Sequence, residues 1–391
     1  MLETLTVASS ALVAYSYLGY PALIWVASRT SVPAVAPPPM PDSALPRLTI
    51  LIAAHDEEAV IGDRIRDALA GDYPPDLLDV VVASDGSTDA TAEVVRNLAG
   101  PRVSLLEFRK RRGKAAVLDD AIPLAAGEVV LLSDANTRLD PEAARRLGRC
   151  FADPSVGVAC GQLILTDPAT GRNADGLYWK YENFLRRAEA RLDALLGANG
   201  AIYAIRRACF VPVPAGTIVD DLVLPMLARL ESGCSIVHDP GALAFEETAA
   251  DLPGEFRRRS RIGAGGFQSL RLLGPLLDPR RGWVALAFFS HKVLRWLGPF
   301  FLAGALFGAS ALAISGRPGY RAFAIAQVAF YALASATALA PPRVRIPMLM
   351  RVPALFAGMN LALLAGFFRW ASGGATGTWD PTPRAPGGVT R

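Results

Sequence analysis

The feature that most limits how this chain can fold is an uncharged run near its beginning. Residues 5–27 contain no Asp, Glu, Lys or Arg, and about 20 apolar residues are enough for a helix to cross a bilayer. A secretory signal peptide is the alternative, but it needs a basic start and a shorter apolar core. Because the chain begins Met-Leu-Glu, we expect a retained transmembrane helix within residues 1–30.

Three more apolar segments follow late in the sequence, at residues 297–315, 323–340 and 352–368. Basic residues separate them, and cytoplasmic loops of membrane proteins carry an excess of Lys and Arg. Arg29 and the larger second cluster (Arg343, Arg345 and Arg351, against Arg317 and Arg321 in the first loop) are therefore placed inside. This predicts a multi-pass protein of the cell inner membrane, with four spans, both termini outside and residues 31–296 on the cytoplasmic side.

A different pattern occupies residues 47–260. Short runs rich in β-branched residues alternate with stretches of helical character, which is typical of βαβ units and a mostly parallel, Rossmann-like sheet. The expected strands are 48–54, 79–84, 103–108, 129–134 and 156–160, and the expected helices are 61–70, 90–98, 114–125 and 141–151. Ligands of such sheets bind beyond the carboxyl ends of the strands.

The remaining segments have simpler patterns. Residues 31–46 are rich in Pro and are expected to form a stiff linker, and residues 372–391 are expected to be a disordered tail. Residues 261–296 are interpreted as interfacial helices that contact membrane lipids, with a surface helix of the globular domain as the alternative. Residues 297–371 are then the C-terminal transmembrane helices.

Composition excludes several classes of function. The net charge of +4 is small, and the arginines lie beside apolar segments, so we expect no nucleic-acid partner. The four cysteines are far apart and form no CxxC pair, which argues against a zinc site or a disulfide framework. We expect all four cysteines to be reduced and buried, as small apolar side chains.

Polar motifs follow three of the expected strands. His55-Asp56-Glu57-Glu58 follows the first strand, Asp85-Gly86-Ser87 the second, and Asp134-Ala135-Asn136 the fourth. An acidic side chain at a strand end can hydrogen-bond a nucleobase or ribose, and two oxygen ligands at positions i and i+2 suit Mg²⁺ or Mn²⁺. Helix-dipole complementation, a tight βα turn and an Asx turn explain each motif taken singly.

Together these motifs resemble the GT-A fold of family 2 glycosyltransferases, in the membrane-integrated branch that includes cellulose, hyaluronan and poly-N-acetylglucosamine synthases. The resemblance covers roughly residues 46–275 and the flanking helices. It implies that His55, Glu57, Asp85 and Lys114 bind a nucleotide-sugar donor, with Asp134 and Asn136 as ligands of Mg²⁺ or Mn²⁺. Asn136 stands where the family's metal motif ends in Asp, and Ser84 stands where many members have another Asp.

Two further elements match the family's catalytic pattern. In Val219-Asp220-Asp221-Leu222 the second acid stands at the position of the family's general base, so Asp221 is the expected catalytic residue. An acidic helix start is the alternative role, and it is the role considered for Asp220. Gly197-Ala198-Asn199-Gly200 resembles the loop beside the acceptor.

The sequence Arg258-x-x-Arg261-Ile262 stands where processive synthases have Gln-x-x-Arg-Trp. Two guanidinium groups can still neutralise a diphosphate, so the donor site is expected to include Arg258 and Arg261. A basic run that faces lipid headgroups is the alternative.

The sequence therefore predicts a membrane-bound inverting glycosyltransferase that acts on a nucleotide-diphosphate sugar, with a UDP-sugar as the expected donor. The acceptor would be a glycan or a lipid-linked molecule, as in exopolysaccharide or cell-envelope glycan synthesis. Transfer of a single sugar to a lipid carrier is one alternative, because Ile262 replaces the Trp on which an acceptor sugar would stack. An inactive membrane scaffold for glycan export is the alternative from another class.

Overall fold

The computed structural model of the chain describes residues 1–31, 40–167, 170, 173, 176–247, 252–341, 344, 346–374 and 377. The chain divides into two compact units, which we call the helical unit and the sheet unit. The helical unit consists of Met1–Leu23, Asp251–Leu270 and Phe288–Ala375, and the sheet unit of Ile24–Ala250, Arg271–Ala287 and Thr376–Arg391.

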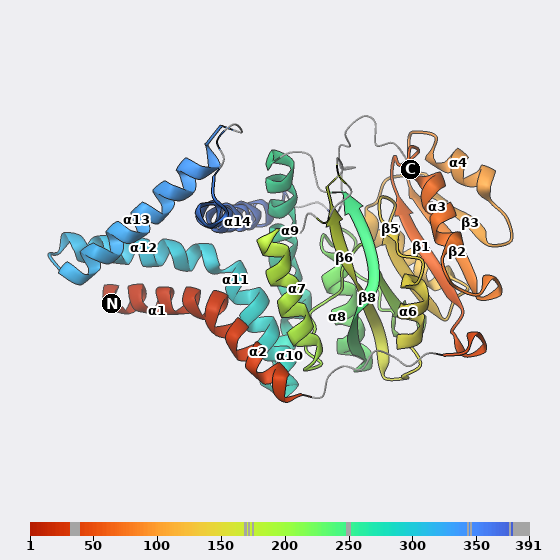
Figure 1. Ribbon diagram of the computed structural model, residues 1–391, viewed down its shortest axis with the longest axis horizontal. Coiled ribbons are helices and arrows are strands. Elements are labelled where there is room, and N and C mark those ends of the chain that lie inside the picture. Colours follow the sequence, from red (N-terminus) through yellow and green to blue (C-terminus); the bar gives the residue numbers. More distant parts are fainter. Residues whose placement is uncertain are drawn as a thin grey trace. The chain divides into compact units, whose positions relative to one another are not determined.

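The sheet unit contains one eight-stranded sheet with the order β3-β2-β1-β4-β7-β6-β8-β5 (Figure 1). Strands β1, β2, β3, β4, β6 and β8 run in one direction, and β5 and β7 run against them. The strands are β1 (Leu48–Ala54), β2 (Leu78–Asp85), β3 (Val103–Phe108), β4 (Val129–Asp134), β5 (Arg138–Leu139), β6 (Val156–Thr166), β7 (Tyr203–Arg206) and β8 (Ser235–Glu247). The five strands expected from sequence are all present, and the mostly parallel sheet is confirmed.

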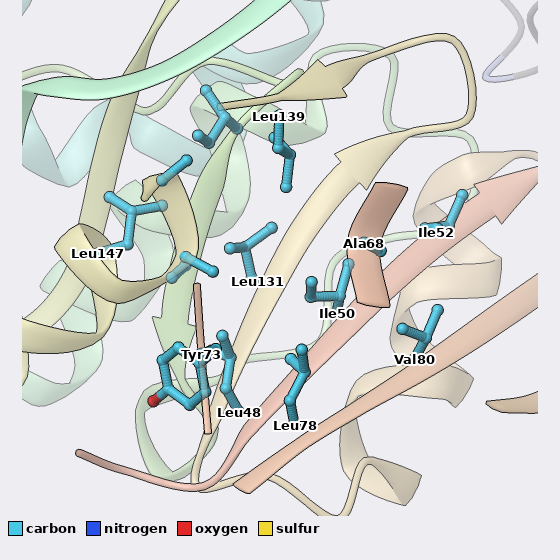
Figure 2. Packing of buried hydrophobic residues seen from close by; sticks show 14 of the residues in the cluster. Leu48, Ile50, Ile52, Ala68, Tyr73, Leu78, Val80, Leu131, Leu139 and Leu147 are labelled. Atoms are coloured by element: carbon cyan, nitrogen blue, oxygen red, sulfur yellow. The ribbon is translucent and has the colours of Figure 1, made fainter. Parts of the chain in front are cut away.

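Helices follow most of the strands. Strands of a parallel sheet are apolar on both faces, so helices are needed to cover them. These helices are α3 (Ile61–Ala70), α4 (Thr91–Leu98), α5 (Lys114–Leu124), α6 (Ala143–Cys150), α7 (Leu177–Ala190) and α8 (Asp220–Ser232). Side chains at alternate positions of β1, β2 and β4 pack against α3 and α6, and Figure 2 shows Leu48, Ile50, Leu78, Val80, Leu131 and Leu147 in this cluster. Every residue of β1 is buried, so the other face of the sheet is also covered at this strand.

The helical unit draws on both ends of the chain. Its helices include α1 (Leu2–Ala14), α12 (Gly298–Ile314), α13 (Pro318–Ala338) and α14 (Met348–Ala371), together with most of α9 (Leu252–Leu273). Among the described residues, three helical segments are long and apolar enough to cross a membrane: Leu2–Thr30, Pro318–Ala338 and Met348–Ala371. A fourth span arises if Trp283–Trp296 and Gly298–Ile314, which meet at 58°, are counted as one bent helix.

Small residues bring the helices of this unit close together. A Cβ placed on Gly308 of α12 would lie 2.1 Å from Thr6 Oγ1 of α1, and one on Gly366 of α14 would lie 2.7 Å from the Ser260 carbonyl oxygen of α9. Such close approach at glycine is typical of helix packing in membranes, where helices gain little from burying apolar surface against each other. Phe267 of α9 also stacks on Trp370 of α14.

Three expectations about segment boundaries have different outcomes. The boundary expected at residue 260 falls inside α9, because this helix begins at Leu252 rather than after the arginine run. Half of the expected linker (residues 32–39) and most of the expected tail (residues 375–376 and 378–391) lie outside the described residues. The division of the remaining chain into domains stays a prediction.

Candidate active site

The polar motifs meet at one edge of the sheet because their strands are neighbours. Parallel pairing aligns Ala54 of β1 with Ser84 of β2, and Ala53 of β1 with Asp134 of β4. The residues that follow β1, β2 and β4 therefore lie side by side at the carboxyl ends, where ligands of open parallel sheets bind. This is the arrangement that the sequence predicted.

The turn after β1 is locked to the turn after β2. His55 is buried, and its Nδ1 lies 2.8 Å from the carbonyl oxygen of Asp85. Asp56 has φ = +53°, an uncommon conformation for a residue with a side chain, and its carboxylate accepts a 2.7 Å hydrogen bond from the Thr88 amide. Glu57 is buried, and its amide donates to Thr91 Oγ1. These bonds hold His55 and Glu57 in fixed positions beside Asp85.

Asp85 organises the turn that precedes α5. The residue is fully buried, and its two carboxylate oxygens accept hydrogen bonds from the amides of Arg112 (2.7 Å) and Gly113 (2.8 Å). Gly86 lets this turn approach, since a Cβ there would lie 2.5 Å from the Arg111 nitrogen. In this structure the carboxylate thus fixes the backbone immediately before Lys114, in addition to any contact with a nucleotide.

Lys114 lies between two carboxylates. Its ammonium is 2.6 Å from Asp134 Oδ1 and 3.7 Å from Asp220 Oδ2. Burial alone would lower the pKa of Lys114, but Asp134 and Asp220 outweigh it and raise the pKa, so the side chain stays cationic. Burial also raises the pKa of Asp220, and the charge of Lys114 opposes that effect. The cluster presents one cation to a phosphate group and two carboxylates to a positively charged partner.

Asp221 occupies a different position from Asp220, although the two are adjacent at the start of α8. Its carbonyl accepts a 2.7 Å hydrogen bond from Ala198, within the 197–200 loop that resembles an acceptor loop. Gly200 of that loop is a neighbour of the side chain, since an added Cβ would lie at the van der Waals distance of 3.6 Å from Asp221 Oδ2. Gly197 has φ = +77°, and a Cβ there would lie 2.9 Å from the same carbonyl oxygen. The loop therefore needs glycine at position 197 to pack against Asp221.

The residues expected to bind a metal ion supply few protein ligands. Among the described residues no group of three His, Cys, Asp or Glu side chains could hold a metal ion. Asp134 is partly exposed and Asn136 is exposed at the strand end. Mg²⁺ is commonly bound through one or two carboxylates together with substrate phosphates, and Asp134 and Asn136 supply one carboxylate and one amide oxygen at the end of β4. The donor set therefore fits a divalent ion that binds together with a diphosphate.

Not all predicted site residues lie in the sheet unit. Arg258 and Arg261 are on α9, within the helical unit. The Arg258 side chain is exposed and lies 3.9 Å from Glu255, and Arg261 is partly exposed. A contact of either arginine with a donor stays a prediction.

Sequence reasoning missed three residues of the site. Asp220 was assigned only to a helix start, yet it is the second carboxylate at Lys114. Tyr203 is fully buried on β7, next in space to β4. Arg186 of α7 donates to the Ala198 carbonyl (3.1 Å) and so holds the 197–200 loop. The pair of adjacent acids was a visible signal for Asp220, whereas nothing in the local sequence marks Tyr203 or Arg186.

A mostly parallel sheet with acidic strand ends, a lysine between carboxylates and a carboxylate beside a glycine loop define a GT-A-like α/β domain. The solved structure of the mannosyltransferase PcManGT from Pyrobaculum calidifontis, in complex with GDP-Man and Mn²⁺, has this fold. It aligns with 95% of this chain and 99% of its own, with a TM-score of 0.71 and 23% sequence identity.

Sequence comparison finds similar glycosyltransferases. The profile of "Glycosyl transferase family 2" matches residues 49–210. An N-acetylglucosaminyltransferase of Rhizobium sp. (strain N33) is 27% identical over 322 residues, which are 77% of this chain and 69% of the relative. A poly-beta-1,6-N-acetyl-D-glucosamine synthase of Staphylococcus aureus (strain COL) is 24% identical over 57% of this chain, and the alignment spans only 55% of that relative. Residues 49–210 thus match the model of family 2 glycosyltransferases, and the comparisons identify the chain as a glycosyltransferase.

Proposed function

We propose that this chain is a membrane-bound inverting glycosyltransferase that extends a glycan or lipid-linked acceptor at the inner membrane, with its sheet unit in the cytoplasm. The observation that carries the proposal is that residues suited to bind the donor and a residue suited to act as the base belong to the same site. Lys114, Asp134 and Asp220 form a charged cluster suited to a diphosphate and a divalent ion, and Asp221 lies beside the 197–200 loop.

The division of roles follows from the chemistry of inversion. The acceptor hydroxyl attacks the anomeric carbon from the face opposite the diphosphate, and one carboxylate takes the hydroxyl proton. Asp221 serves as this base, because it is partly exposed and next to the loop that resembles an acceptor loop. Asp220 is buried against Lys114 and therefore supports the donor side. A divalent ion held by Asp134 and Asn136 would neutralise the charge that develops on the leaving diphosphate.

The donor is proposed to be a UDP-sugar, with UDP-N-acetylglucosamine as the first candidate. Both sequence relatives carry N-acetylglucosamine in their names, and this supports the candidate. GDP-mannose is the matched comparison, because the solved structure with the same fold contains it. Purified protein incubated with each labelled donor and Mn²⁺ should consume the UDP-sugar, and NMR of the product should show an inverted anomeric centre.

Transfer of a single sugar to a lipid carrier is the second candidate. Ile262 stands where processive synthases have a Trp, and its side chain is 41% exposed, so no aromatic ring at this position stacks on an acceptor sugar. Product length on a gel separates the two: a ladder supports polymerisation, and a single lipid-linked product supports one addition.

The sharpest test assigns the base to one of the two adjacent acids. Asp221→Asn keeps the size of the side chain but removes its basicity, and general-base assistance is worth about 10²–10⁴-fold in rate. We expect kcat to fall at least about 100-fold in Asp221→Asn while UDP binds with unchanged affinity. Asp220→Asn should instead weaken donor binding. A fully active Asp221→Asn enzyme would contradict the assignment, and an inactive Asp220→Asn enzyme with normal UDP binding would make Asp220 the base.

A further inference from the structure

Tyr203 lies on the side of the sheet that carries the acidic cluster. Its backbone pairs with Leu132 of β4, and its side chain is fully buried. Directly opposed residues of antiparallel strands share a face, as do residues two apart on one strand. Tyr203 therefore shares a face with Asp134, which is two residues beyond Leu132.

Two buried polar atoms of this region lack partners in the described part of the chain. One is the hydroxyl of Tyr203, a hydrogen-bond donor, and the other is Oδ2 of Asp220, an acceptor. The Lys114 ammonium lies 3.7 Å from that oxygen, beyond hydrogen-bonding distance. Buried polar groups are nearly always hydrogen-bonded in native proteins, so each exception needs an explanation.

The tyrosine is able to act only as a neutral donor. Burial raises the pKa of Tyr203 well above its ordinary value, and the negative charges of Asp220, Asp221 and Asp134 raise it further. The hydroxyl therefore keeps its proton throughout the working pH range.

We propose that Tyr203 is a positioning residue for sugar transfer, whose hydroxyl donates a hydrogen bond to Asp220 when the donor is bound. The inference rests on the proposed function. A diphosphate would draw the flexible Lys114 side chain towards itself, and Asp220 would then be a buried carboxylate without its cation, which is costly. Tyr203 supplies a replacement partner. Because Asp220 begins α8 and adjoins Asp221, holding Asp220 also holds the proposed base against its loop.

The test is Tyr203→Phe in the full-length protein in detergent, which keeps the ring and removes only the hydroxyl. Because that hydroxyl has no hydrogen-bond partner among the described residues, the melting temperature should stay the same or rise. A hydrogen bond to a charged group formed only in the loaded enzyme should cost about 10- to 100-fold in kcat. KM for the donor should change less than about twofold.

Tyr73→Phe is the matched control, and we expect its effects on melting temperature and kcat to be the opposite of those of Tyr203→Phe. Tyr73 is also buried, but its hydroxyl donates a 2.5 Å hydrogen bond to the carbonyl of Pro46, away from the strand ends. This variant should melt at a lower temperature and keep its kcat. A Tyr203→Phe enzyme that behaves in the same way would show that Tyr203 is a structural tyrosine and would overturn the proposal.

A double-mutant cycle with Asp220 tests the partner. If Tyr203 acts through Asp220, Tyr203→Phe should change kcat less than about threefold once Asp220→Asn is present. Full additivity of the two effects would overturn the assignment of Asp220. If the wild type and Tyr203→Phe are both fully active, only this inference is contradicted. If the wild type transfers no sugar from any donor, the proposed function is contradicted as well.

Discussion

Asp85→Asn separates the structural role of Asp85 from its predicted contact with a nucleotide. The carboxylate is fully buried and accepts hydrogen bonds from the amides of Arg112 and Gly113. The Asn side chain has one acceptor oxygen, and its NH₂ group would face one of the two amide donors. The substitution therefore removes a charge-assisted hydrogen bond, weakens the other, and leaves one backbone N–H without an acceptor.

The size of the effect follows from these losses. A hydrogen bond to a charged group contributes about 1.5–3 kcal/mol, and a buried donor without a partner costs about 1–3 kcal/mol. Because the two terms overlap, we expect the free energy of unfolding to fall by about 2–4 kcal/mol. For a domain of this size that corresponds to a drop in melting temperature of about 4–16 °C.

Asp120→Asn is the matched control, because both acids contact Arg112. The Asp120 carboxylate lies 2.6 Å from the Arg112 guanidinium, and both side chains are exposed. Exposed ion pairs contribute little, so this variant should melt within about 2 °C of the wild type.

The assay is thermal unfolding of the detergent-purified protein with and without UDP, beside UDP binding by calorimetry. Asp85→Asn should lower the melting temperature in both conditions and also weaken UDP binding, since Lys114 follows the distorted turn. If Asp85→Asn melted like the Asp120→Asn control and lost only UDP affinity, Asp85 would be a nucleotide contact without the structural role, and our reasoning would be refuted.

Three further predictions concern the metal, pH and topology. Asp134→Ala should abolish transfer, and EDTA should abolish wild-type transfer until Mn²⁺ is restored; an active, chelator-resistant Asp134→Ala enzyme would contradict the metal site. Burial, with the charges of Arg186 and Arg187, lowers the pKa of His238 to about 3, below its unfolded value of about 6.5. Folding with a neutral His238 therefore costs nothing above pH 6.5, whereas at pH 5 the unfolded chain gains a proton that the folded protein does not. Acidification to pH 5 should lower the free energy of unfolding by roughly 1–2 kcal/mol in the wild type, and His238→Gln should not show this loss. Equal losses of stability in the two proteins would contradict the role of His238. A reporter fused after Ser31 should read cytoplasmic and one at Pro318 external, and the reverse result would invert the topology.

The local elements of this chain could be predicted from its sequence. Each expected strand from residue 48 to residue 160 is present, because an apolar β-branched run is a local pattern that needs no knowledge of distant residues. The long apolar helices were equally visible, since their length and lack of charge are set by consecutive residues. The motifs after β1, β2 and β4 could be expected to meet because parallel neighbours share one edge.

The roles of individual side chains were decided by the tertiary structure. Asp220 and Asp221 are adjacent in sequence, but successive residues of a helix point about 100° apart, so one reaches Lys114 and the other faces Gly200. The two backbone amides that donate to the Asp85 carboxylate come from residues 27 and 28 positions away. Such contacts depend on how strands and helices pack, and packing between distant segments leaves no periodic signal in the sequence.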